Sequence, residues 1–561
     1  MEVGGLMEVL AMEVGGLMEV LAIVALSIIA ILMVAGTIVD ILHRLEFKAP
    51  SKNILGVSPK HSAHRGTYQL LPDDDKTIVG LFNGKVGSEK NDAGMKELDL
   101  DPDVMDEVVD YESESKPLTD ENISSNLGIL SKVLIAFSVY TNGSKVLNTS
   151  QSPGSLTAIH GIRFLSMSWV ILGHFFVFPA PQTANALTVV DEWFHRRSFD
   201  VITNAFLSVD TFFTISGLLV AYLMYQEIMK TGWRINWAIY YFHRFWRLTP
   251  PYMLSMLLVL GLQKFMGSGA LWASTQPAQK TACENNWWTN ILYINNFYSW
   301  PADECFIHAW YLANDMQFYV ITPLMLIPFY FHLYAGLASC LTFLLAQWII
   351  AGVLTAVNRW PVAFFSLAKP PSLDWLTHYY IAPYCRIGPY VIGILAGCYL
   401  AHTNGKTRIP KYVVAIGWTA AIATGLILVY GIHGDITGNS PSSVGVSVLY
   451  NAVARSAWGV CICWVIVACR CGYGGPVNVL LSWSPFVLLG RLTYMAYLIH
   501  PCVIEVYAGN FESLFFIDET NIAISYMGIL FFTYMAAFVL MLGLESPMIG
   551  IEKILLDKIK I

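Results

Sequence analysis

The strongest constraint on this chain is a series of apolar runs, each about as long as a bilayer is thick. Such a run crosses a membrane as an α-helix, because a lone strand would leave its backbone hydrogen-bonding groups unpaired in lipid. The composition agrees, with 55% hydrophobic and only 13% charged residues, whereas a soluble domain has roughly 25% charged residues. The sequence therefore predicts an all-α fold, a polytopic transmembrane helical bundle.

The predicted spans number about ten in the body of the chain, after one N-terminal anchor span at 20–39. The body spans are expected at 161–178, 205–225, 250–267, 310–331, 333–356, 378–401, 411–430, 448–469, 486–507 and 521–544.

The chain divides by composition into segments of different character. The string MEVGGLMEVLA occurs twice in residues 1–22, and the acidic stretch before residue 127 has too few large apolar residues to form a core. Because this stretch supplies much of the net charge of -7, no nucleic-acid partner is expected. The predicted organisation is a repeat and anchor (1–40), a disordered cytosolic linker (41–126), an interfacial lead-in (127–160), a transmembrane domain (161–550) and a cytosolic tail (551–561).

Basic residues alternate between the connections and predict an orientation. They gather at 230–247, 406–411 and 553–560 and at Arg470 and Arg491, all on one side of the predicted bundle. Short basic connections face the cytosol. The connections 179–204, 268–309, 357–377 and 431–447 then face the lumen or the cell exterior.

Cys283 and Cys305 lie in one of these outer connections. An oxidising compartment favours a disulfide between them, and two free thiols are the alternative. The sequons at Asn122, Asn142 and Asn148 fit poorly with a cytosolic placement of their segment, because only lumenal sequons are glycosylated.

The first body span carries Arg163 and His174, which are 11 residues apart. On a helix this spacing puts them roughly 16 Å apart along the axis and about 20° apart around it, on one face. One interpretation is that Arg163 anchors the helix in the headgroups and His174 makes one interhelical hydrogen bond. The alternative is a functional polar stripe through the apolar layer.

A second basic feature, YYFHRFWRLTPPY, places His243, Arg244 and Arg247 just before a span. Arginine binds phosphate oxygens in bidentate fashion, so a polyanionic ligand and simple positive-inside anchoring are both possible. Further polar groups lie deep in predicted spans and either form structural pairs, such as Asp315 with Arg386, or line a cavity. They are Asp210, Asp315, Gln317, Arg386 and His500.

A histidine beside a carboxylate in such a cavity has the parts of a general base. The sequence shows no nucleophile elbow, Walker loop or spaced set of metal ligands, so no metal is expected. Histidine and aspartate are the available reagents.

The order of these motifs resembles the membrane acyltransferase-3 family. The shared features are the Arg-then-His spacing, DTFFTISG, HRFWRLTPPY, WYLANDMQFY and YLIHP; FSVYTNGSKVLNT, HGIRFLSMSWVILGH and WWTNILYINNF resemble its animal branch, the nose-resistant-to-fluoxetine proteins. The resemblance covers about residues 130 to 550. Two positions depart from bacterial relatives, which often have Glu at Asp315 and Arg at His243.

The resemblance implies transfer of an acyl group from cytosolic acyl-CoA or acetyl-CoA, as donor co-substrate, to a hydroxyl-bearing acceptor on the other side. It implies His174 as the reactive histidine with Arg163 as its motif partner, and Arg244 and Arg247 near the donor phosphates. With the polar groups above, the predicted catalytic residues are His174, Asp315 and His500. The predicted donor-binding residues are Arg163, His243, Arg244, Arg247 and Arg386.

Two other functions are compatible with the same polar residues. The chain could transport lipids or small hydrophobic compounds, or act as a sensor that has lost the activity. Membrane lipids are expected partners in each case, and the endoplasmic reticulum or the plasma membrane is the expected location. Release of free CoA separates an acyltransferase from a transporter.

Overall fold

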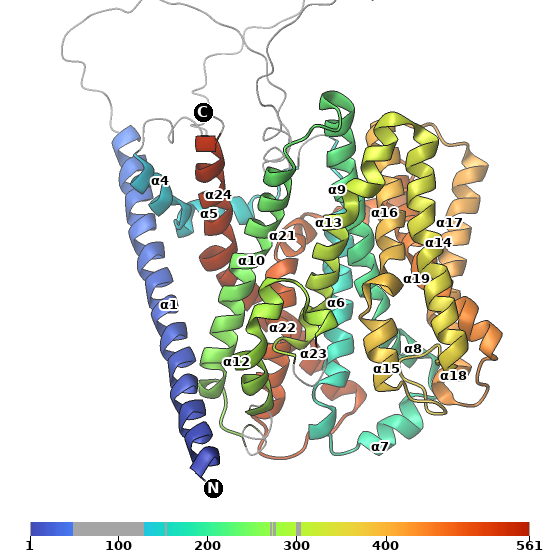
Figure 1. Ribbon diagram of the computed structural model, residues 1–561, viewed down its shortest axis with the longest axis horizontal. Helices are drawn as coiled ribbons and strands as arrows, with labels where there is room; N and C mark the ends of the chain where they lie inside the picture. Colours follow the sequence, from blue (N-terminus) through green and yellow to red (C-terminus); the bar gives the residue numbers. More distant parts are fainter. Residues whose placement is uncertain are drawn as a thin grey trace, which may run out of the picture.

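The computed structural model describes residues 2–48, 128–151, 154–269, 272, 277–298 and 304–559. These residues form a bundle of long helices running between two ends of the molecule (Figure 1). Within the described ranges the only β-type pairing is one isolated bridge between Thr183 and Phe515. The predicted all-α class is confirmed.

The long helices supply the scaffold, and short helical turns connect them. The long helices are α1 (Glu2–Lys48), α6 (Ala158–Val177), α9 (Leu207–Thr231), α10 (Trp237–Leu262), α12 (Pro277–Ile291), α13 (Trp310–Phe331), α14 (Leu333–Asn358), α16 (Pro383–Thr403), α17 (Lys411–Tyr430), α19 (Val444–Arg470), α22 (Thr493–Gly509), α23 (Glu519–Leu540) and α24 (Ser546–Ile559). The shorter helices are α4 (Ile129–Ala136), α5 (Val139–Leu147), α7 (Ala186–Thr188), α8 (Asp200–Thr203), α15 (Leu373–Trp375), α18 (His433–Thr437), α20 (Gly475–Leu481), α21 (Ser484–Arg491) and the π-helical turn η8 (Met541–Glu545).

Fewer helices than predicted qualify as membrane spans by length and composition. Among the described residues, 8 qualify, or 9 if the bent pair α21 and α22, which meet at 67°, counts as one span. Helices form at all the predicted body positions, but α6 and α13 fall below the limit because polar residues lower their hydropathy. Helices are thus present at all the predicted positions, and 8 or 9 spans within the described part of the chain meet this criterion of length and composition.

The two ends of the bundle match the predicted alternation of connections. The basic connections after α9, α16 and α19 lie at the end where the C-terminus lies, whereas α7, α8, α15 and α18 lie at the other end (Figure 1).

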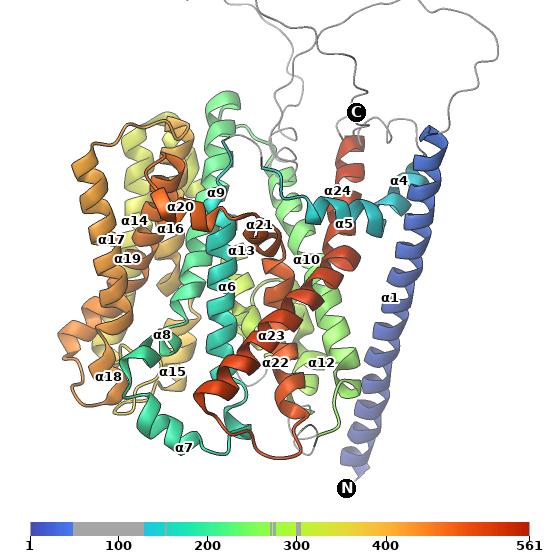
Figure 2. The ribbon, with the colours of Figure 1, turned by 180° about the vertical axis from the view of Figure 1, so that it is seen from behind.

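The N-terminal helix packs directly against α10 and also contacts the lead-in helices α4 and α5, which lie between α1 and α24 (Figure 2). Asp40 of α1 is buried and accepts hydrogen bonds from the hydroxyls of Ser138 and Thr141, both at 2.6 Å. Asn142 is also buried, and its Nδ2 donates to the Ala136 carbonyl oxygen. A glycan on Asn142 would require this nitrogen, so Asn148, which is exposed, is the better site for mapping topology.

Two predicted boundaries differ from the structure. Helix α1 continues through residues 41–48, which were expected to begin the linker; the remainder of that linker, with the sequon at Asn122, lies outside the described residues. Residues 551–559, expected as a tail, form the second half of α24. The reason is packing, since Glu552 of α24 is buried against α10.

The closest helix pair is α9 with α16, whose contact depends on small residues. A Cβ added to Gly393 would lie 2.1 Å from the Thr214 carbonyl oxygen, and one added to Gly217 would lie 2.2 Å from that of Tyr390. Small residues allow helix backbones to approach this closely, which is how helices associate in membranes.

Candidate active site

Two histidines from distant parts of the chain meet in the bundle. His174 near the end of α6 and His500 in the middle of α22 lie with Nδ1 of His174 2.7 Å from Nε2 of His500. Their rings are nearly parallel, at 4° to one another. His500 is fully buried, whereas His174 is half-buried. The predicted helix face of His174 therefore turns toward another histidine.

The backbone of α22 determines which nitrogen carries the hydrogen. In an α-helix the carbonyl of Tyr497 would accept from the N–H of residue 501, but Pro501 has none. Nδ1 of His500 lies 2.8 Å from this carbonyl oxygen. Because a carbonyl can only accept, Nδ1 of His500 is the donor and its Nε2 is the acceptor in a neutral ring.

The same argument carries over to His174. Its Nδ1 faces the acceptor nitrogen of His500 and must donate. Nε2 of His174 then holds a lone pair, and no hydrogen-bond partner for it is present in the described residues. A neutral imidazole nitrogen that is held in this way can remove a proton from a substrate.

A third histidine, which sequence reasoning missed, completes the cluster. The ring of His308 lies 5.5 Å from that of His500, at 72°, and His308 is 6% exposed. The signal was available, because His308 lies two residues before the start of the polar WYLANDMQFY motif and three residues after Cys305.

Two tyrosines link this cluster to a group of charged residues, and sequence reasoning missed them as well. The Tyr497 ring lies 5.2 Å from His308 and 5.4 Å from Tyr311. Tyr311 interacts electrostatically with Asp315 and Arg163. A continuous line of polar and aromatic groups thus runs from the histidines to the charged residues.

The charged group centres on an ion pair between Arg244 of α10 and Asp315 of α13. The Arg244 guanidinium also lies 5.0 Å from the centre of the Tyr319 ring. Arg247, one helical turn along α10, is half-buried and makes no hydrogen bond or ion pair with any described residue. The structure brings together the predicted Arg163, Arg244 and Asp315, but it places Asp315 against Arg244 rather than His174.

Two predicted donor-binding residues lie elsewhere. His243 is buried against Glu552 of α24. Arg386 is fully buried and its Nη1 donates to both carboxylate oxygens of Asp210, at 2.9 and 3.1 Å. The alternative pairing of Asp315 with Arg386, which the sequence allowed, does not occur.

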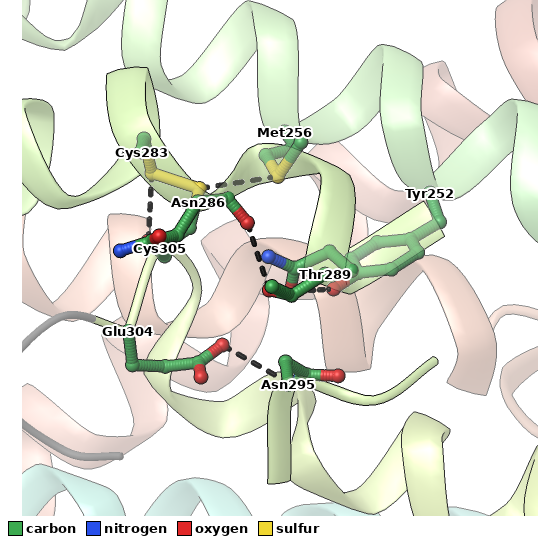
Figure 3. The surroundings of a disulfide bond; sticks show 9 residues. Tyr252, Met256, Cys283, Asn286, Thr289, Asn295, Glu304 and Cys305 are labelled. Atoms are coloured by element: carbon green, nitrogen blue, oxygen red, sulfur yellow. Dashed lines mark hydrogen bonds between the residues drawn. A yellow bond between two sulfur atoms is a disulfide. The ribbon is translucent and has the colours of Figure 1, made fainter. Parts of the chain in front are cut away.

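A disulfide joins Cys283 to Cys305 and holds the segment before α13 against α12 and α10, as predicted (Figure 3). Beside it, Glu304 accepts a hydrogen bond from Nδ2 of Asn295 at 3.0 Å. Burial raises the pKa of Glu304 to about 8, although hydrogen bonds from Asn295 and the Phe306 backbone oppose this. The carboxyl of Glu304 is therefore largely protonated at neutral pH.

The described residues contain no group of three or more His, Cys, Asp and Glu side chains arranged to hold a metal ion. The chemistry available at the site is proton transfer by histidine, with hydrogen bonding by tyrosine and charge stabilisation by arginine.

Comparisons with known proteins agree with the geometry. Residues 156–544 match the acyltransferase domain of the acyltransferase-3 family. The chain is 31% identical over 475 residues to "Nose resistant to fluoxetine protein 6" of Caenorhabditis elegans, covering 79% of this chain and 57% of that protein. It is 26% identical over 442 residues to "Regulator of hypoxia-inducible factor 1" of the same organism, covering 72% of this chain and 81% of that protein.

A bacterial relative is more distant. The chain is 27% identical over 222 residues to "O-acetyltransferase OatA" of Staphylococcus aureus, covering 39% of this chain and 32% of that protein. The chain thus spans only part of the length of two of these three relatives. No solved structure matches. The helical bundle and the match over residues 156–544 confirm the predicted resemblance, and this integral multi-pass membrane protein belongs to the acyltransferase-3 family.

Proposed function

We propose that this protein is a membrane O-acyltransferase that moves an acyl group from acyl-CoA at its cytosolic end to a hydroxyl-bearing acceptor. The observation that carries the proposal is the open Nε2 of His174, whose lone pair is fixed through His500 and the carbonyl of Tyr497. The family match and the O-acetyltransferase relative support this reaction class.

In the proposed reaction, Nε2 of His174 takes the proton of the acceptor hydroxyl as its oxygen attacks the thioester carbonyl. The carbon–sulfur bond then breaks, an ester forms, and the CoA thiolate leaves and takes up the proton. Atoms and charge balance, because one O–H bond and one C–S bond are exchanged for one C–O bond and one S–H bond. No oxidant or metal is required.

His500 has the orienting role in this mechanism. It holds the ring of His174 by accepting from Nδ1, and the Tyr497 carbonyl stabilises the positive charge that the proton brings to the histidine pair. A third group that orients the base in this way is a general feature of activated nucleophile sites. The ring of Phe178, 4.8 Å from His174, covers the other side of the base.

Charge favours Arg247 as the residue that binds the phosphates of the donor. Arg244 is already neutralised by Asp315, whereas Arg247 has no partner in the described residues. Guanidinium groups bind phosphate oxygens strongly. A half-buried guanidinium loses less of this binding free energy to competition with water. Arg163, on the same helix as His174, interacts electrostatically with Tyr311.

The central test compares His174→Ala with a matched control, His195→Ala, an exposed histidine that contacts only its own turn. Purified full-length protein receives acetyl-CoA and propane-1,2-diol, and free CoA thiol and acetyl ester are measured. The His174 variant should lose about 10²- to 10⁴-fold in rate with an unchanged melting temperature, and the control should match wild type. Near-wild-type transfer by His174→Ala would overturn the proposal.

A donor test uses Arg247→Ala, with Arg234→Ala, an exposed arginine at the same end, as the control. The KM for acetyl-CoA should rise several-fold in the Arg247 variant, and the difference from wild type should shrink at high salt. An unchanged KM would show that Arg247 does not bind the donor and would favour a role in anchoring the helix at the membrane surface. In vesicles, passage of intact substrate without release of CoA would instead identify a transporter.

A further inference from the structure

The side chain of His308 carries an unpartnered buried nitrogen near the site, as does Arg244 at Nε, and Asp315 has an unpartnered buried oxygen, Oδ1. His308 is 6% exposed, and its Nε2 has no hydrogen-bond partner in the described residues. A buried polar atom without a partner is rare and costs free energy, commonly about 1 to 3 kcal/mol. The proposed mechanism so far gives this nitrogen no role.

The surroundings of His308 hold its ring in place. The ring of Phe306 lies 4.3 Å away, and the hydroxyl of Tyr497 donates to the His308 carbonyl oxygen. The disulfide at Cys305 fixes the preceding turn to α12 (Figure 3). The unpartnered nitrogen is therefore in a rigid position, as a preorganised binding group needs to be.

The position of the ring hydrogen determines what Nε2 can do. A neutral imidazole carries one hydrogen, on Nδ1 or on Nε2. In the form with the hydrogen on Nδ1, Nε2 of His308 holds a lone pair, like Nε2 of His174.

The position of His308 in the chain favours the acceptor over the donor. His308 lies in the turn Ile307–Ala309 before α13, and its ring is beside that of His500, which holds His174, the base that takes the acceptor's proton. It interacts electrostatically with His174. An acceptor bound at Nε2 of His174 is therefore next to the histidine cluster that contains His308.

We infer that His308 is a second acceptor-binding residue, whose Nε2 accepts a hydrogen bond from a donor group adjacent to the reacting hydroxyl. This inference rests on the proposed function, since it assigns the acceptor of that same site. One hydroxyl has one hydrogen, which goes to His174, so the preferred acceptor carries a second O–H or N–H nearby.

The test compares two acceptor probes that differ by one hydroxyl, propane-1,2-diol and propan-1-ol, with acetyl-CoA as the donor. The ratio of their kcat/KM values is measured for wild type, His308→Phe and His308→Gln. A ratio within one preparation does not depend on the fraction of folded protein. The wild type should prefer the diol about tenfold, His308→Phe should show a ratio near one, and His308→Gln, whose side-chain oxygen also accepts, should keep part of the preference.

Two results would overturn the inference, and they are distinguishable from failure of the proposed function. A wild-type ratio near one, or an undiminished ratio in His308→Phe, rejects the role of His308 while transfer still depends on His174. Undiminished transfer in His174→Ala rejects the proposed function, and the inference falls with it.

Discussion

The pair of His174 with His500 and the pair of Asp210 with Arg386 look alike in sequence, since both place ionisable residues in apolar helices. Their surroundings in the structure differ. The side chains of Asp210 and Arg386 are both 0% exposed, and Nε of Arg386 also donates to the Tyr380 carbonyl oxygen. The guanidinium also lies over the rings of Trp310 and Tyr380, at 5.0 and 4.7 Å from their centres. The two residues of this pair neutralise each other and are enclosed by the protein.

Both pairs leave bonding capacity unused, since Nη2 of Arg386 has no hydrogen-bond partner in the described residues, but Arg386 and Asp210 neutralise each other's charge and are fully buried. One nitrogen of His174 and one of His308 have no partner in the described residues, and His174 is half-buried. A polar group that is neutralised by the protein supports the structure, whereas one that is held but unsatisfied is available to a ligand. Burial together with hydrogen bonding, rather than residue type, distinguishes structural from reactive polar groups here.

The largest effect is expected from breaking the Asp210–Arg386 pair. Arg386→Ala leaves Asp210 as an unpaired buried carboxylate, which should cost about 3 to 5 kcal/mol and lower the melting temperature strongly. Replacing both residues, Asp210→Asn with Arg386→Gln, removes the lone charge and should recover part of the loss. A stable Arg386→Ala protein with weakened acyl-CoA binding would restore the predicted donor-binding role of Arg386.

The next effect is on activity rather than stability. His500→Ala removes the group that accepts from Nδ1 of His174, and kcat should fall about 10²-fold or more, as for other orienting residues. His500→Gln keeps a side-chain oxygen that can accept from Nδ1 and should recover part of the rate. If both variants retain wild-type kcat, the tautomer of His174 is not set by His500.

A smaller effect is expected from Pro501→Ala. The new N–H competes with His500 for the Tyr497 carbonyl, so transfer should fall several-fold although alanine is the better helix former. The matched control is Pro328→Ala in α13, where the carbonyl of Leu324 accepts instead from the Ser339 hydroxyl. Rate and melting temperature are measured on the same preparations; equal rates for both variants would remove Pro501 from the mechanism.

The smallest effect concerns Glu304, a buried carboxyl that, unlike Asp210, forms no ion pair with any described residue. Its pKa is raised from 4.5 to about 8 by burial, so the folded protein binds more protons than the unfolded chain between these pH values. Its contribution to stability is complete below pH 4.5 and is lost as the pH rises to about 8. The melting temperature of wild type should therefore fall by a few degrees relative to Glu304→Gln over this range, and parallel curves would contradict the assignment.

Sequence reasoning located most of the polar residues but not their partners. His174, His500, Arg244 and Asp315 were expected near a site, and the disulfide was expected between the cysteines it joins. His308 was missed because one histidine outside a predicted span carries no periodic signal. Its importance follows only from its contacts with α22.

The sequence by itself determined the all-α membrane class, the positions of the helices and the face on which each polar residue lies. These are local properties, because hydropathy and helical periodicity depend on neighbours along the chain. Only the tertiary structure decided that His174 meets a residue 326 positions away, that Asp315 pairs with Arg244, and that Arg386 is enclosed with Asp210. Helices in a membrane choose partners by close packing and by satisfying buried polar groups, and both depend on the arrangement of the whole bundle.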